Sequence, residues 1–149
     1  MDIIFPYKVS VRFPGDLEYI PPIRKFVSEL LQVSNFSPKF AYRSEIIVDE
    51  ICNNAVNYGC RTSNAEIELI CEIFEDRIEF TINDQGSTKE NLDQLMSVIK
   101  QPIDPEKDIQ HGLGLEIVRM LSENVDVVID EKNLTSVHIV RKREDIEQK

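Results

Sequence analysis

The chain of 149 residues is long enough for one domain with a buried core, and 42% of its residues are hydrophobic while 30% are charged. A net charge of −10, from 27 acidic and 17 basic side chains, opposes direct binding to nucleic acid. Since no apolar run approaches the roughly 20 residues that span a bilayer and no signal peptide is recognisable, we expect a cytoplasmic protein without membrane contact.

The elements follow in the order β-α-α-β-β-loop-α-β-β. Alternating apolar residues predict strands, and apolar residues at helical spacing predict helices. We expect a strand over 7–13, helices over 21–34 and from 37 to about 58, a hairpin of strands over 65–74 and 77–84, an irregular region over 84–111 with one amphipathic stretch at 92–99, a helix over 112–124, and a second hairpin over 125–130 and 134–142.

Strands that come as hairpins and helices that come in groups favour an α+β fold. We expect a two-layer α/β sandwich, with a mixed, mostly antiparallel sheet and helices on one face. No repeat or linker divides the chain, so residues 1–149 are expected to form a single domain. Cys52, Cys60 and Cys71 show no Cys-x-x-Cys spacing, which predicts free buried thiols rather than disulfides or a zinc site.

Residues 49–59 read DEICNNAVNYG and place Glu50 and Asn54 one helical turn apart, within about 40° around the helix axis. Asparagine is a poor helix former, so a plain solvent-facing stripe would sooner carry Lys, Glu or Arg. The pair indicates a ligand site, but a stripe that simply faces water stays open as an alternative.

Two more segments have a pattern typical of ligand sites. A predicted strand ends at Asp84 with Gly86 close behind, and a carboxylate there can accept a hydrogen bond from a ligand amine, although Asp-x-Gly is also an ordinary turn. Gly112 and Gly114 open the next helix, where free N–H groups and the positive end of the helix dipole would cradle a phosphate. Each glycine costs a helix up to about 1 kcal/mol relative to alanine, so packing or a ligand must justify the pair.

These segments, in this order, resemble the motifs of the GHKL ATPase superfamily, and the likeness covers about residues 8–142. EICNNA (50–55) resembles its N-box, DQGS (84–87) its first glycine box and GLGLEIV (112–118) its second. A short chain without a dimerisation helix or phosphoacceptor histidine is similar to the anti-sigma-factor serine kinases of bacterial partner-switching systems. The resemblance implies the Bergerat fold, with one ATP-binding kinase domain and a lid over about 87–111.

The resemblance also implies a function: an ATP-dependent protein serine kinase that acts as an anti-sigma factor. Glu50 would be the general base, Asn54 would hold Mg²⁺, and Asp84 with Thr135 would bind adenine, which favours ATP over GTP. The other implied nucleotide-binding residues are Gly86, Gly112, Leu113, Gly114 and Leu115, with Gly86 and Gly112 also serving as lid hinges. The implied partners are a sigma factor, an anti-sigma-factor antagonist as the substrate, and a second copy of the chain.

The first helix, with Arg24 and Lys25, resembles the partner-facing element of these kinases, although an exposed pair of basic residues is more often just solvated. Three departures from the family pattern leave alternatives open. Ser87 replaces a glycine of the first glycine box, Leu134 replaces the glycine before Thr135, and Tyr58 stands where a histidine often closes the N-box. The alternatives are a non-catalytic ATP-binding or degenerate partner-binding regulator, a detached histidine-kinase-type ATPase domain, and a sandwich without a ligand.

Overall fold

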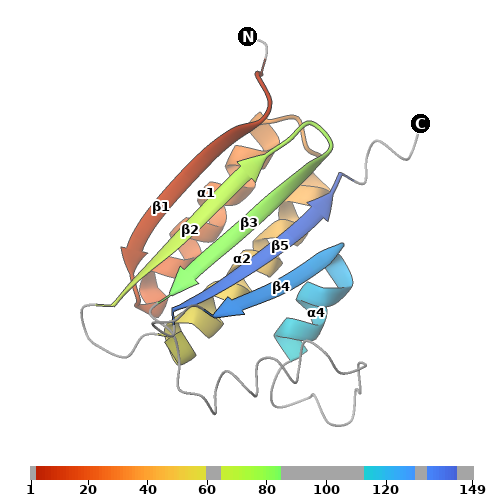
Figure 1. Ribbon diagram of the computed structural model, residues 1–149. Helices are drawn as coiled ribbons and strands as arrows, with labels where there is room; N and C mark the ends of the chain where they lie inside the picture. The colour runs from red at the N-terminus through yellow and green to blue at the C-terminus, as the bar shows by residue number, and fades with distance from the viewer. Residues whose placement is uncertain (1–2, 60–64, 85–112, 130–133, 144–149) are drawn as a thin grey trace.

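The computed structural model describes residues 3–59, 65–84, 113–129 and 134–143 (Figure 1). Its elements are β1 (Tyr7–Pro14), the 3-10 turn η1 (Leu17–Tyr19), α1 (Ile20–Val33), α2 (Pro38–Gly59), β2 (Glu66–Ile73), β3 (Arg77–Asp84), α4 (Leu113–Leu121), β4 (Asn124–Ile129) and β5 (Thr135–Lys142). The predicted stretch at 92–99 and the expected lid with Gly86, Ser87 and Gly112 lie outside the described residues.

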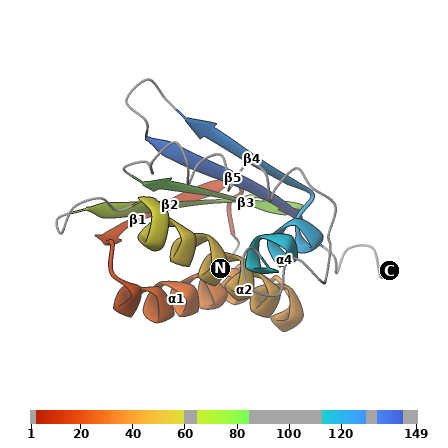
Figure 2. The same ribbon diagram turned by 90° about the horizontal axis from the view of Figure 1, so that it is seen from below.

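The strands form a five-stranded sheet in the order β1-β2-β3-β5-β4. Figure 2 shows α1, α2 and α4 on one face of this sheet, so the predicted two-layer sandwich is confirmed. Every pairing between the described strands is antiparallel, without the parallel pair that a mixed sheet would contain. In the described part of the chain, no helix is both long and apolar enough to cross a membrane.

The core lies between the sheet and the helices. In β2 and β3 every second side chain is buried against the helices, as the period of two in the sequence predicts. From the helix layer, Val27, Leu31, Ile47 and Val48 are fully buried. Each such side chain contributes about 1.5–3 kcal/mol through burial, which fixes both long helices on the sheet.

The sheet has two ends that matter for the site. At one end, which we call the hairpin end, β1 begins, the β2–β3 turn lies and β5 finishes, as the pairing of Tyr7 with Ile73 and of Ile78 with Arg141 requires. At the other end, which we call the site end, β3 finishes and β5 begins. Figure 1 shows the site end at the lower left, away from both marked chain ends.

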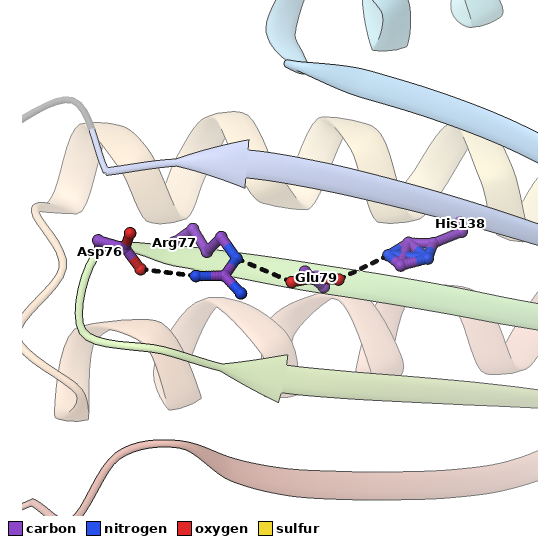
Figure 3. A network of polar contacts seen from close by, with 4 residues as sticks. All are labelled: Asp76, Arg77, Glu79 and His138. Atoms are coloured by element: carbon purple, nitrogen blue, oxygen red, sulfur yellow. Dashed lines mark hydrogen bonds and ion pairs between the residues drawn. The ribbon is translucent and has the colours of Figure 1, made fainter.

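The face of the sheet opposite the helices carries polar side chains. Figure 3 shows one chain of contacts there, from Asp76 through Arg77 and Glu79 to His138. Glu79 is at the centre, with one carboxylate oxygen 2.8 Å from Arg77 Nε and the other 2.8 Å from His138 Nε2. This network crosses from β3 to β5 near the hairpin end, far along the strands from Asp84.

Candidate functional site

Asp84 and Thr135 are direct partners in the β3–β5 register, at the site end of the sheet. Both are in phase with the buried residues of their strands, so their side chains are on the side of the sheet that faces the helices. Thr135 is only 3% exposed, and among the described residues its Oγ1 has no hydrogen-bond partner. A buried hydroxyl left unsatisfied costs about 1–3 kcal/mol, so the arrangement suits a ligand that would bond to it.

These strand ends also border an open hollow of about 500 Å³ on the sheet. Its described lining includes Asp84 and Thr135, together with Arg12, Glu68 and Asn83 from the face of the sheet opposite the helices. Asn83 Nδ2 donates to Glu68 Oε1 at 2.9 Å, and this hydrogen bond, with help from Arg12, holds the pKa of Glu68 below its ordinary value. The hollow therefore holds charges of both signs within hydrogen-bonding reach of each other.

Glu50 and Asn54 lie on α2, and both are partly buried rather than fully exposed. Burial, and then the neighbouring Asp49 carboxylate, raise the pKa of Glu50 above its ordinary value. A carboxyl whose pKa is raised by burial is suited to accepting a proton, since its charged form is less stabilised by water. The predicted stripe thus lies at the edge of the core, which disfavours the alternative that it simply faces water.

Arg141 joins three of the elements that carry predicted site residues, namely β5, α2 and α4. It is 1% exposed, and its guanidinium donates to Phe40 O at 2.9 Å and Ser44 Oγ at 2.7 Å on α2 and to Leu121 O at 2.9 Å on α4. Its Cζ also lies 4.0 Å from the centre of the Phe40 ring. A single side chain of β5 therefore fixes the start of α2 and the end of α4 at the hairpin end of the sheet.

From this anchor, all three elements extend toward the site end. Ten residues of α2 separate Ser44 from Asn54, a rise of about 15 Å, and six residues of β5 separate Arg141 from Thr135, a length of about 20 Å. Figure 1 shows α2 running along the strands and ending in the lower part of the view, where β3 ends and β5 begins. Because the three elements share this anchor and direction, Glu50 and Asn54 lie toward the same end of the molecule as the Asp84–Thr135 pair.

The predicted phosphate cradle falls at the start of α4. The helix begins at Leu113, so the backbones of Leu113, Gly114 and Leu115 form its first turn, where N–H groups have no intrahelical partner. Helix α4 contacts α2, and it also extends from its Arg141 anchor toward the lower part of Figure 1. Gly112, the residue just before it, lies outside the described residues.

Sequence reasoning missed Arg141, although a signal was present. Thr135, Val137, Ile139 and Arg141 are in phase on β5, and the first three are apolar or small, so an arginine in that series had to be buried or at an edge. The pairing of Arg24 with Asp49, at 2.9 Å between α1 and α2, had no comparable local signal. Within the described residues, no group of three His, Cys, Asp or Glu side chains could hold a metal ion by itself.

The model of the histidine kinase-like ATPase domain family matches residues 13–140. The chain belongs to this family. The recognition from three ordered motifs is thereby confirmed, and the family implies binding of ATP. Similar proteins include the serine-protein kinases RsbW of Bacillus mycoides (strain KBAB4), at 27% identity, and of Bacillus cereus (strain AH187), at 26% identity, each over 128 residues that cover 83% of this chain and 79% of the relative.

Two solved structures share the fold. A chain of the SiaB–SiaC complex from Pseudomonas aeruginosa matches with a TM-score of 0.71 at 16% identity, covering 89% of this chain and 88% of that chain. The RsbU and RsbW domains of Rv1364c from Mycobacterium tuberculosis match with a TM-score of 0.65 at 13% identity, covering 91% of this chain and 32% of that chain. At these identities the likeness shows that this chain shares their fold, and nothing more.

Proposed function

We propose that this family member is an ATP-dependent protein serine kinase that acts as an anti-sigma factor. The observation that carries the proposal is the Asp84–Thr135 pair, which offers a carboxylate and an unsatisfied buried hydroxyl at one strand end. A carboxylate accepts hydrogen bonds only, so this end of the site suits an adenine amine and disfavours the carbonyl that guanine has in its place. The similarity to serine-protein kinases RsbW supports the same reading.

The rest of the nucleotide would extend from Asp84 toward the helices. Backbone N–H groups at the start of α4 would hold phosphate oxygens, and Gly114 would leave room for them. Asn54 would offer its amide oxygen to Mg²⁺, which commonly takes one or two protein ligands and fills the other positions with phosphate and water. When bound, Mg²⁺ would neutralise part of the phosphate charge. One asparagine suffices for this role, so the lack of a larger metal-binding cluster in the described residues does not conflict with it.

Glu50 would be the general base of the transfer. It would orient the hydroxyl of a serine on the substrate protein and take its proton. The serine oxygen then forms a bond to the γ-phosphorus while the bond from that phosphorus to the β–γ bridging oxygen breaks, and ADP leaves. General-base catalysis of this kind contributes typically 10²- to 10⁴-fold, with positioning supplying much of the rest.

The proposed protein partners are a sigma factor, which the chain would sequester, and an anti-sigma-factor antagonist, which it would phosphorylate. The outer side of α1, with Arg24 partly exposed and Lys25 exposed, is the proposed docking element, and a homodimer is the proposed assembly. Both the similarity to the RsbW kinases and the structural likeness to a chain of the SiaB–SiaC complex support a role with a protein partner.

The direct test is transfer of radiolabel from γ-labelled ATP to purified anti-sigma-factor antagonists, with wild-type protein and Glu50→Gln. We expect acid-stable label on serine with the wild type, and transfer roughly 10²- to 10⁴-fold slower with Glu50→Gln although ATP binding is retained. Asn54→Ala should lose the Mg²⁺-dependent part of ATP binding. Transfer by Glu50→Gln at the wild-type rate would refute the role of Glu50.

A second function has one observation in its favour. Leu134 stands at the position of a family glycine, is 41% exposed and lines the hollow that Asp84 and Thr135 border. A side chain there could favour a protein that binds ATP, or has lost it, and holds a partner without catalysis. Such a protein would show no transfer of label to any antagonist, whereas a histidine-kinase-type ATPase domain would give an acid-labile product.

A further inference from the structure

An ion pair joins α1 to α2 directly beside the proposed base. Arg24 Nη1 on α1 lies 2.9 Å from Asp49 Oδ1 on α2, and the two side chains are 37% and 30% exposed. Asp49 immediately precedes Glu50, and its backbone carbonyl accepts a hydrogen bond from Asn53 Nδ2 at 2.6 Å. Arg24 therefore holds the Asp49 carboxylate toward α1, and the hydrogen bond from Asn53 stabilises the helix turn that carries Asp49.

The charges around Glu50 are few. Helix α1 contributes Arg24, which contacts Asp49, and α2 itself contributes Asp49. The inner faces of β2 and β3, which contact α2, present apolar side chains, the Cys71 thiol and, at the last residue of β3, the Asp84 carboxylate. Among the α4 side chains that the structure describes, Arg119 is the charged one, and it has contacts of its own. After burial, Asp49 is the group that raises the pKa of Glu50, and Arg24 is the ion-pair partner of Asp49.

We propose that Arg24 is a positioning residue, which acts through Asp49 to keep Glu50 ionised and ready to accept a proton. This inference rests on the proposed function, in which Glu50 is the base. While Arg24 is paired with Asp49, its positive charge offsets the Asp49 carboxylate, and the repulsion on Glu50 is weak. When the pair is broken, the Asp49 charge is uncompensated and repels the Glu50 carboxylate. Glu50 then stays protonated up to a higher pH.

The pair also links Glu50 to the molecular surface. Arg24 is partly exposed on α1, so a carboxylate of any protein that docks on this helix can compete with Asp49 for its guanidinium. Such competition would act on Glu50 as the loss of Arg24 does. The bridge is thus a route by which occupation of α1 would change the activity of a base on another helix, without movement of the sheet.

The test is a direct titration of Glu50 in the nucleotide-free protein. The ¹³C carboxyl resonance of Glu50 is followed by NMR across pH in the wild type, Arg24→Gln, Arg24→Lys and Asp49→Asn. We expect the Glu50 midpoint to move to higher pH in Arg24→Gln, to return toward the wild-type value in Arg24→Lys, and to move to lower pH in Asp49→Asn. Lys25→Gln removes the same charge from the next position of α1, which contacts no described carboxylate, and should leave the midpoint in place.

The double variant Arg24→Gln/Asp49→Asn tests whether Arg24 acts through Asp49. Its Glu50 midpoint should lie close to that of the wild type, because both charges of the pair are removed. If Arg24→Gln raises the Glu50 midpoint by the same amount in the Asp49→Asn background as in the wild type, the inference is wrong. It is also wrong if Arg24→Gln leaves the Glu50 midpoint unchanged. If Arg24→Gln does not fold, an unchanged midpoint in Asp49→Asn is sufficient to overturn it.

A kinetic measurement then separates this inference from the proposed function. In phosphate transfer, the acid limb of the pH profile of kcat should move upward in Arg24→Gln, with roughly three- to tenfold slower transfer at mildly acidic pH and recovery at higher pH. A merely structural loss would lower kcat at all pH values. If no protein transfers phosphate but the NMR midpoints move as expected, the proposed function fails and the link between Arg24 and Glu50 stands.

Discussion

Asp84 and Thr135 face each other across the boundary between β3 and β5, so the register of two strands sets the distance between a carboxylate and a hydroxyl. They come from opposite ends of the segment that contains the proposed lid and α4. Any slip of one residue between the strands would turn one of the two side chains to the other face of the sheet. The apolar alternation that buries β3 and β5 thus also specifies this pair.

Replacing Thr135 should change the stability of the fold and the affinity for ATP in opposite directions. Because Thr135 Oγ1 is buried and unsatisfied among the described residues, Thr135→Val should stabilise the nucleotide-free protein by about 1 kcal/mol. The same change should weaken ATP binding by roughly two- to tenfold, through loss of one hydrogen bond. Asp84→Asn, which removes a charged acceptor, should weaken it by about 10- to 100-fold. Chemical denaturation and a fluorescent ATP titration measure both effects, and Thr81→Val on the outer face of β3 is the control. Stability and affinity that fall together would contradict the assignment.

Glu50 should cost the free protein stability at neutral pH. Its pKa is raised by burial and then by Asp49, and a carboxyl with a raised folded-state pKa stabilises the fold only below its unfolded pKa. That contribution is lost as the pH rises through the folded-state pKa. We therefore expect Glu50→Gln to melt at a higher temperature than the wild type at neutral pH, with the difference vanishing below about pH 4, where the carboxyl is protonated in both states. Thermal unfolding without nucleotide checks this, with Glu29→Gln on the exposed side of α1 as the control for lost charge.

Arg141 should be among the residues on which the fold depends most. Arg141→Met keeps much of the volume but removes the guanidinium that donates to Leu121 O and to Phe40 O. We expect a loss of about 3 kcal/mol in the free energy of unfolding. Because the anchor also orients α4, nucleotide affinity should fall in protein that is still folded. Ser44→Ala, which removes one of the acceptors named above, should cost about 1 kcal/mol. Urea unfolding of both variants measures the difference, and equal small losses would refute the anchor role.

The two described cysteines should be unreactive in the folded protein. Burial raises the pKa of Cys52 to about 12, with smaller contributions from Cys71 and Asp49, and burial alone raises the pKa of Cys71 to about 12. Since the thiolate is the reactive form, a Cys60→Ser variant should not react with a disulfide reagent at neutral pH until it is denatured. Rapid labelling of the native variant would show that α2 and β2 open locally.

Local patterns in the sequence were enough to predict the architecture. Alternation located all five strands, and helical spacing with Pro and Gly at the ends located α1 and α2 to within a residue or two. The expected helix over 112–124 was too long, because β4 already begins at Asn124 and apolar spacing does not signal that change. The turn η1 was missed, although Asp16 Oδ1 accepts a hydrogen bond from the backbone N–H of Glu18 there and so caps it.

The candidate site was less accessible from the sequence. Glu50, Asn54 and Asp84 were singled out from the sequence itself, whereas Thr135 and the roles of all four came from the resemblance to the family, and these roles stay predictions. That Asp84 and Thr135 are direct partners depends on strand register, which is a property of the folded chain. Arg141 and the Arg24–Asp49 bridge join elements far apart in the sequence, and no spacing rule within one element indicates such contacts.

The start of β1 and the end of β5 share the hairpin end of the sheet, opposite Asp84. With 8 residues in β3 and in β5, Tyr7 and Lys142 are separated from the proposed nucleotide site by the length of a strand, about 25 Å. A dye, an affinity tag or a fused reporter attached beyond either position would therefore lie away from the proposed site. Immobilising the protein through such an attachment would leave the site end of the sheet open to solution, which suits the protein to single-molecule measurement.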